Sequence, residues 1–185
     1  LNDLTGEAVA VSILSQGNVV LVLKEETRHD FRVATHTGSI LVAHASAMGK
    51  ALLSELSEVD VDSILPKEEL KPMTKNTITS KAELKRELKK IRETGLSFDT
   101  EGNYEGLIGI ASVVRDATGR AVAALSIGLP TFRADQTTRD RVSVLVKMGA
   151  QLISYRLGYQ DKAHSVRDLE EISTWWEQNK LASTF

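Results

Sequence analysis

The stretch from Leu107 to Leu129, LIGIASVVRDATGRAVAALSIGL, constrains the fold more than any other part of this chain. Two apolar runs flank the short polar loop Asp116-Ala117-Thr118-Gly119, which ends in the glycine that a tight turn favours. The pattern predicts a β-hairpin. A loop of those residues sets Gly109 opposite Ser126, and a register error of two residues would leave both faces of the hairpin unchanged.

The two faces of this hairpin differ in side-chain size, because side chains alternate across a strand. One face is large and aliphatic, with Ile108, Ile110, Val114, Leu125 and Ile127. The other is nearly bare and carries a single hydroxyl, with Gly109, Ala111, Ala124, Ser126 and Gly128. We expect the aliphatic face to pack on a core. The bare face leaves room for a closely packed element or for a small molecule.

Hydrophobic periodicity and capping residues predict the other elements. In chain order they are a hairpin of Glu7–Leu14 and Val19–Glu25, a weaker third strand at Phe31–Thr35, a helix beginning at Ser46, a short helix at Ser57–Leu65, a helix from the capping box at Ser80 to Gly95, a strand at Leu96–Asp99, and a long helix at Asp135–Tyr159. This order predicts an α+β fold with helices beside an antiparallel sheet. A polar tail, 160–185, follows with a helix around Val166–Trp176, and we expect Trp176 or its neighbour Trp175 to pack on the body.

The helix that begins at Ser46 has small residues in its first turn. Ser46 is a good N-cap, and Ala47, Met48 and Gly49 follow it. Free backbone N–H groups and the helix dipole make such a turn a ready site for an anion. The alternative is that Gly49 and the alanines only permit close packing between helix and sheet, and these residues alone leave both readings open.

Composition bounds the class of protein. The 185 residues suffice for one domain with a real core, and the formal net charge of −2 argues against direct DNA binding by this chain. The sequence contains no cysteine, no signal-peptide pattern and no apolar run of the ~20 residues that span a membrane, so we expect a cytoplasmic location. It opens without methionine, which suggests a fragment of a longer protein.

Catalytic and metal-binding patterns are weak. None of the four histidines has metal-ligand spacing, and neither a phosphate loop nor a dinucleotide fingerprint is present, so we expect no metal and no cofactor. Asp99 and Glu101 are paired acids at a strand end, but solvated carboxylates are the more economical interpretation. His44 is close to Ser46, but the serine lacks the surroundings of a nucleophile elbow.

Three motifs resemble those of the isocitrate lyase regulator (IclR) family of bacterial transcription regulators. His44-Ala45-Ser46-Ala47-Met48-Gly49-Lys50-Ala51-Leu52-Leu53 is similar to the H-A-S-x-x-G-K-A-L-L signature, and Glu105 to Ala111 and Val114 to Ser126 follow the family pattern. The resemblance runs from about Gly6 to Gly158. It implies a GAF-like effector-binding domain over 1–159, with a curved antiparallel sheet of about six strands and helices on its faces. The DNA-reading winged helix would precede this chain.

The resemblance also implies a site for a small organic acid. The carboxylate would meet the start of the helix at Ala47 and Met48, with Asp99 nearby. Gly109 stands where some members have cysteine, and Ser126 and Gly128 stand where some have two serines. These departures favour an effector larger than glyoxylate or pyruvate, such as an aromatic or sugar-derived acid. We therefore expect Gly109→Val to impair binding without changing the melting point.

Combining both lines of reasoning, the candidate ligand-binding residues are Ala47, Met48, Gly49, Asp99, Tyr104, Leu107, Gly109, Ser126 and Gly128. The leading hypothesis is a ligand-sensing domain that forms a homo-dimer or tetramer and contacts DNA only through the winged helix. One alternative is an acid–base enzyme acting on a small carboxylate with Asp99, Glu101 and His44. A second alternative is a pure oligomerisation module with a vestigial pocket.

Overall fold

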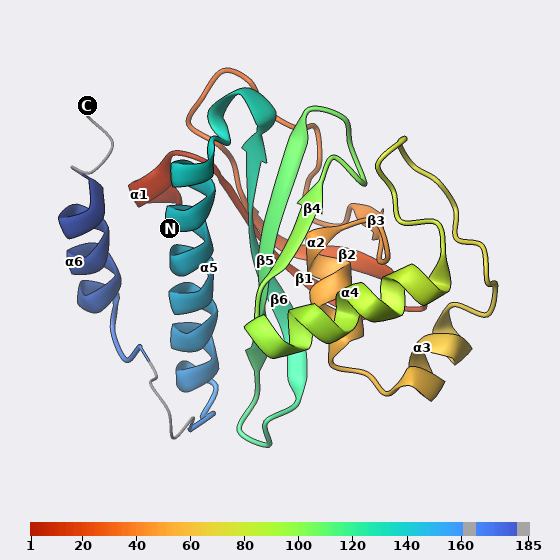
Figure 1. The fold of residues 1–185 in the computed structure, drawn as a ribbon. Coiled ribbons are helices and arrows are strands. Elements are labelled where there is room, and N and C mark those ends of the chain that lie inside the picture. The colour runs from red at the N-terminus through yellow and green to blue at the C-terminus, as the bar shows by residue number, and fades with distance from the viewer. Residues whose placement is uncertain (161–165, 181–185) are drawn as a thin grey trace.

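The computed structural model describes residues 1–160 and 166–180, and it is built on one antiparallel sheet of six strands (Figure 1). The strands lie in the order β3-β2-β1-β6-β5-β4. They span Ala8–Ser15 (β1), Asn18–Glu25 (β2), Ile40–Val42 (β3), Ser97–Thr100 (β4), Leu107–Arg115 (β5) and Ala121–Pro130 (β6). The predicted α+β class and curved antiparallel sheet are confirmed.

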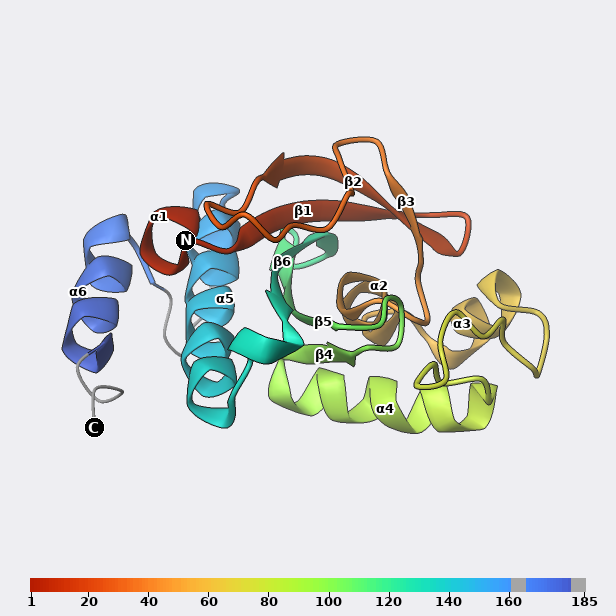
Figure 2. The same cartoon turned by 90° about the horizontal axis from the view of Figure 1, so that it is seen from above.

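The helices cover both faces of the curved sheet, as the view from above shows (Figure 2). They span Asn2–Thr5 (α1), Ala47–Ser54 (α2), Glu58–Ile64 (α3), Lys81–Thr94 (α4), Gln136–Arg156 (α5) and Leu169–Lys180 (α6), with a 3₁₀ turn at Thr131–Arg133 (η1). The sheet curls around α2, and α4 packs beside α2. On the opposite side α5 packs on β5 and β6, and α6 packs on α5. None of the described helices is long and apolar enough to cross a membrane.

The central β5–β6 hairpin has the predicted faces but not the predicted register. Gly109 pairs with Gly128, and Ala111 pairs with Ser126, which is two residues from the expected pairing. The shift arises near the turn, where the register is irregular between Val114 and Arg115. Because the error is two residues, every side chain keeps its predicted face.

Each hairpin face contributes to a different core. The aliphatic face packs under α5, in a cluster that includes Ile108, Ile110 and Ile127. The small-residue face meets α2, and Ala111 and Ala124 join the cluster formed by α2, α4 and the first hairpin. Ala111 and Ala124 are buried, so close packing against the sheet occupies one part of the bare face.

The third strand was predicted at the wrong place. Phe31–Thr35 alternates like a strand but makes no ladder, and the strand that pairs with β2 is Ile40–Val42. Alternation does not decide which segment finds a pairing edge. Residues 33–35 are instead held by Lys24, whose ammonium group donates hydrogen bonds to the carbonyl oxygens of Val33 and Thr35.

Capping residues predicted the helix ends well. Ser46, Ser57, Ser80 and Asp135 each accept a hydrogen bond from the backbone of the following turn, and Gly95 ends α4 at φ 71°. In the tail, the helix runs over Leu169–Lys180 rather than Val166–Trp176, and the tail residues 161–165 and 181–185 lie outside the described part. Trp176 is buried against α5, as expected for one tryptophan of the pair.

Candidate ligand-binding pocket

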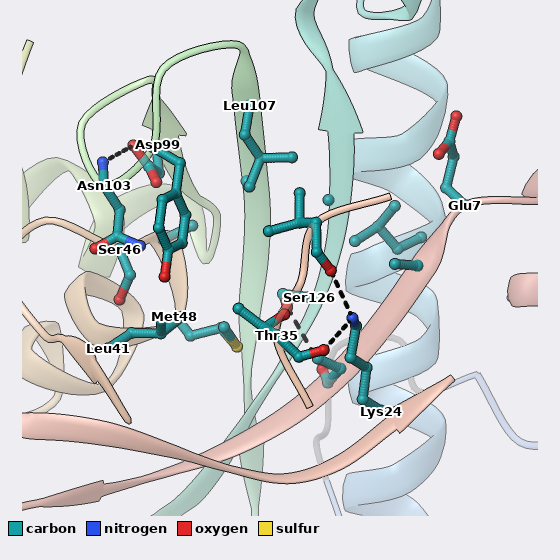
Figure 3. A pocket seen from close by; sticks show the side chains of 18 of the residues that line it. Glu7, Lys24, Thr35, Leu41, Ser46, Met48, Asp99, Asn103, Leu107 and Ser126 are labelled. Carbon is teal, nitrogen blue, oxygen red and sulfur yellow. Dashed lines mark hydrogen bonds between the residues drawn. The ribbon is translucent and has the colours of Figure 1, made fainter. Parts of the chain in front are cut away.

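A pocket opens between the small-residue face of the sheet, the start of α2 and the segment that joins β2 to β3 (Figure 3). Its atom-free space, counted together with the open solvent at its mouth, is about 740 Å³. Sites for small molecules are lined mostly by apolar side chains, with a few polar groups. This lining has the same character: leucine, valine, methionine and aromatic side chains surround a few charged and polar ones.

The structure brings together most of the residues that the sequence proposed for the site. Eight of those nine line this pocket: Ala47, Met48, Asp99, Tyr104, Leu107, Gly109, Ser126 and Gly128. Four different elements and a loop deliver them, which only the folded sheet can do.

Gly49 is the exception, because it does not line this pocket. A Cβ at this position would lie 2.2 Å from the carbonyl oxygen of Ala43, so Gly49 permits close packing of α2 on the preceding chain. Its N–H is also engaged, because it donates to Oγ of Ser46 at 3.1 Å. The packing alternative therefore holds for Gly49.

The first two N–H groups of α2 remain available at the pocket wall. Ser46 satisfies the N–H groups of Gly49 and Lys50, with its hydroxyl and its carbonyl respectively. Within the described residues, the N–H groups of Ala47 and Met48 have no acceptor. The positive end of the helix dipole adds to the attraction of these N–H groups for an anion. This corner of the pocket suits a carboxylate.

Asp99 lies beside this corner at the end of β4. Its Oδ1 accepts hydrogen bonds from the backbone N–H groups of Gly102, at 2.5 Å, and Asn103, at 3.3 Å. Burial raises the pKa of Asp99 to about 6, although these bonds and the Lys50 ammonium act in the opposite direction. The carboxyl group thus holds the loop that carries Tyr104.

The residues of the acid–base alternative do not converge in the pocket. Glu101 uses its Oε1 to accept from the N–H of Gly106, at 2.8 Å, and so closes the same loop. His44 is buried with Nε2 2.9 Å from the carbonyl oxygen of Lys71, it does not line the pocket, and burial lowers its pKa. Among the described residues, no group of three or more His, Cys, Asp or Glu side chains is placed to hold a metal.

Gly109 and Gly128 play different roles in the pocket floor. A Cβ at Gly109 would lie 3.2 Å from the Cβ of Ala47, which is a tight contact between β5 and α2. A Cβ at Gly128 would lie 3.7 Å from Leu107 Cδ1, which is ordinary contact distance. The expectation that Gly109→Val leaves the melting point unchanged is therefore inconsistent with the packing. Gly128 is the position where a side chain fits.

Sequence reasoning missed Lys24 and the segment after it. The register between β1 and β2 is irregular, since Val11 pairs with Leu23 and Ser12 with Leu21, so Val22 is an extra residue. Without the bulge, Leu23 would share a face of β2 with Leu21. With the bulge, Lys24 shares that face, and both Leu21 and Lys24 line the pocket. Strict alternation points Lys24 away from the pocket, so no signal in the sequence could have identified it.

Comparison with known proteins identifies relatives of this chain. Residues 1–155 match the family described as bacterial transcriptional regulator IclR, C-terminal. Over 161 residues the chain is 32% identical to the HTH-type transcriptional regulator KdgR of Dickeya chrysanthemi. This alignment covers 87% of this chain and 53% of KdgR. The chain is 37% identical to the HTH-type transcriptional repressor AllR of Escherichia coli K12, over 87% of this chain and 59% of AllR. The chain therefore spans between half and three fifths of these relatives.

A solved structure of a complex with a small molecule shows the same fold. The inducer-binding domain of the PobR transcription factor from Acinetobacter, a double mutant in complex with 3-hydroxybenzoic acid, superimposes with a TM-score of 0.75 at 30% identity. The match covers 83% of this chain and 90% of that one.

The curled sheet with helices on both faces is the architecture of the regulator domains to which this chain is similar. This chain belongs to the IclR family, as its effector-binding domain. Its relatives are transcription regulators and repressors, so the acid–base enzyme alternative is wrong.

Proposed function

We propose that this domain senses a small organic acid and transmits its presence to a DNA-binding segment of the full protein. The observation that carries the proposal is the pair of open N–H groups on Ala47 and Met48 in the wall of an apolar pocket. A carboxylate at that position would gain charge-assisted hydrogen bonds, and the rest of the ligand would lie against the small-residue floor.

The floor favours a ligand with a body larger than two or three carbons. Gly109 and Gly128 leave the sheet bare, and Ser126 supplies one hydroxyl, whose Oγ is 3.5 Å from the carbonyl oxygen of Ala10. An aromatic or sugar-derived acid suits this space. The inducer-binding domain of PobR, with its 3-hydroxybenzoic acid, supports an acid of that size.

The full protein is proposed to be a homo-dimer or tetramer that binds DNA in the cytoplasm through a preceding winged helix. Paired reading heads need paired supports to meet operator half-sites. The net charge of −2 gives this domain no electrostatic grip on DNA. Sedimentation should show self-association, and the isolated domain should not retard an operator fragment.

Calorimetric titration with matched pairs tests the ligand class. Benzoate, 3-hydroxybenzoate, hexanoate and gluconate are each compared with the corresponding amide. We expect saturable binding of acids without turnover, and at least about tenfold weaker binding of the amides, because an amide gives up a charge-assisted hydrogen bond. Equal affinity of acids and amides would contradict an anion site.

Ala47→Pro tests the placement of the carboxylate. Proline is favoured in the first turn of a helix, and it removes only the N–H at issue. The extended backbone of Ser46, at φ −99° and ψ 148°, is compatible with a following proline. We expect weaker acid binding with unchanged helix content, and Ala47→Ser serves as the control that retains the N–H.

A further inference from the structure

Lys24 places a buried ammonium group in the pocket wall opposite the start of α2. Its side chain is 5% exposed, and its Nζ bonds the carbonyl oxygens of Val33, at 3.1 Å, and Thr35, at 2.5 Å. Figure 3 shows Lys24 and Thr35 at one side of the pocket, Asp99, Asn103 and Ser46 at the other, and Met48 between them. The pocket therefore has two polar ends.

The charge of Lys24 is balanced at the protein surface. Its third acceptor is Oε2 of Glu26, at 3.0 Å, and the Glu26 side chain is 50% exposed. A half-exposed carboxylate is a weak counter-ion, because water screens it and its side chain gives up rotamer freedom to stay in place. The two carbonyl oxygens solvate the ammonium but carry no charge.

The other charged groups of the pocket do not neutralise Lys24. Glu7 is held by Arg133 through two hydrogen bonds, at 2.7 and 3.0 Å. Asp99 is committed to the loop after β4. Arg32 adds an exposed positive charge at the rim. The polar end at Lys24 is thus the cationic end of the pocket.

We propose that Lys24 is a specificity-determining residue, and that the effector is an acid with a second oxygen-bearing group remote from its carboxylate. This inference rests on the proposed function. The carboxylate lies at Ala47 and Met48, and the second group, a carboxylate or a hydroxyl, takes the place of Glu26 on the Lys24 ammonium. Glu26 then turns into solvent, where its charge is fully hydrated.

Replacing Glu26 by the second group of the ligand costs the protein little free energy, and only ligands with that group gain affinity from it. Lys24 keeps its carbonyl partners, so the segment after β2 stays in place over the pocket. A ligand without the second group leaves the Lys24–Glu26 pair intact and gains nothing from it. Glu26 is therefore a competitor inside the protein for the same ammonium.

The test compares parent acids with partners that bear a second group, in wild type and in variants of the cationic end. The probes are benzoate with 3-hydroxybenzoate and isophthalate, and hexanoate with adipate and gluconate. The variants are Lys24→Met, Lys24→Arg and Glu26→Gln. Lys147→Met is the matched control, because Lys147 also donates to a backbone carbonyl, that of Thr94, but lies outside this pocket.

We expect wild type to prefer a partner bearing a second group by about tenfold or more over its parent acid, the scale of one charge-assisted hydrogen bond. Lys24→Met should abolish this preference while retaining parent-acid binding, and Lys24→Arg should keep part of it. Glu26→Gln should raise the affinity for the diacids several-fold. A lysine that only ties the segment predicts no gain in Glu26→Gln. Lys147→Met should behave as wild type.

The results separate the inference from the function on which it rests. If the preference survives in Lys24→Met, or if Glu26→Gln leaves diacid affinity unchanged, Lys24 is a structural tie and the inference is overturned while acid sensing stands. If wild type binds none of the parent acids or their partners, acid sensing itself fails. If Lys24→Met loses parent-acid binding too, Lys24→Arg and Glu26→Gln decide between the two roles of Lys24.

Discussion

The carboxylate of Asp99 accepts a 2.5 Å hydrogen bond from the N–H of Gly102 and thereby fixes the loop that brings Tyr104 to the pocket. The same carboxylate is desolvated, which raises its pKa to about 6 from 3.8. The two effects oppose each other: the bond to Gly102 favours the charged form, and burial favours the neutral form. Desolvation is the larger.

Asp99→Asn should therefore gain stability relative to wild type as the pH rises. The folded wild type holds its proton more tightly than the unfolded chain, so the stabilisation from this proton is complete below about pH 3.8 and is lost as pH rises through about 6. At roughly 1.4 kcal/mol per pKa unit this amounts to about 3 kcal/mol at most. Asparagine keeps the acceptor and has no charge to desolvate.

Urea unfolding of both proteins between pH 4 and 7 measures the difference in free energy of unfolding. Asp116→Asn is the control, because hydrogen bonds from Thr118 and Arg120 lower the pKa of Asp116, and its difference from wild type should change with pH in the opposite direction. A difference between Asp99→Asn and wild type that does not vary with pH would show that Asp99 has an ordinary pKa.

Much of the fold follows from local patterns in the sequence. Serine and aspartate caps, alternation in the hairpins and the glycine after α4 specify where most elements begin and end. The strand predicted at Phe31–Thr35 is wrong because the segment alternates as a strand does, whereas pairing depends on a non-local sheet edge. Ile40–Val42 occupies that edge beside β2. The predicted register of the hairpin is wrong because the irregularity at Arg115, near the turn, does not change the pattern of hydrophobic residues.

The site divides in the same way. Small residues on one hairpin face and at a helix start are visible in the sequence, and they identify most of the pocket floor. Lys24 is not visible, because a bulge in β2 reverses the direction that alternation assigns to it. Gly49 misleads because an open N–H and a close-packed backbone both favour glycine, and only the 2.2 Å approach to Ala43 distinguishes them.

Gly128→Val and Gly109→Val should separate pocket filling from packing. Valine suits a strand, and a Cβ at Gly128 has ordinary contact with Leu107, so we expect a melting temperature close to wild type and at least about tenfold weaker acid binding. At Gly109 the Cβ presses on Ala47, and overpacking of this kind costs about 1–3 kcal/mol.

Thermal unfolding and calorimetry on the same samples measure both effects. Equal losses of stability in the two variants would contradict the difference in space beside Gly109 and Gly128. Unchanged acid affinity in Gly128→Val would place the body of the ligand away from this strand.

The single substitution Arg133→Met should destabilise the protein more than the double substitution Glu7→Gln/Arg133→Met. Glu7 is 5% exposed, and its two carboxylate oxygens bond Nε and Nη2 of Arg133. Removing the arginine leaves the buried Glu7 charge without its partner, which typically lowers the free energy of unfolding by about 3–5 kcal/mol. Removing both charges costs less. His29, with Nε2 3.6 Å from Glu7, offers a partial replacement when it is protonated.

A double-mutant cycle in urea measures the coupling between the two residues. Arg120→Met is the control, since Arg120 pairs with Asp116 while its side chain is 79% exposed. Additive effects of the two substitutions would show that the pair contributes no coupling.

The C-terminal tail is proposed to be a separate unit that docks on α5, and Trp176→Ala tests this. Residues 1–155 carry the family match, and α6 lies beyond them. Trp176 is 9% exposed, packs with Ile172 and Leu145, and has the guanidinium of Arg141 4.2 Å from its ring centroid. Removing such a ring costs about 3–5 kcal/mol, which exceeds what a single docked helix retains.

Hydrogen exchange should therefore show loss of protection throughout α6 in Trp176→Ala, while the amides of β5 and β6 keep theirs. Trp175→Ala is the matched control, because Trp175 is only partly buried at the edge of the same cluster, and it should leave most of the protection in α6. Equal loss of protection in the sheet and in α6 would mean that the tail and the sheet unfold as one cooperative unit, so that residues 1–159 are not an independent domain.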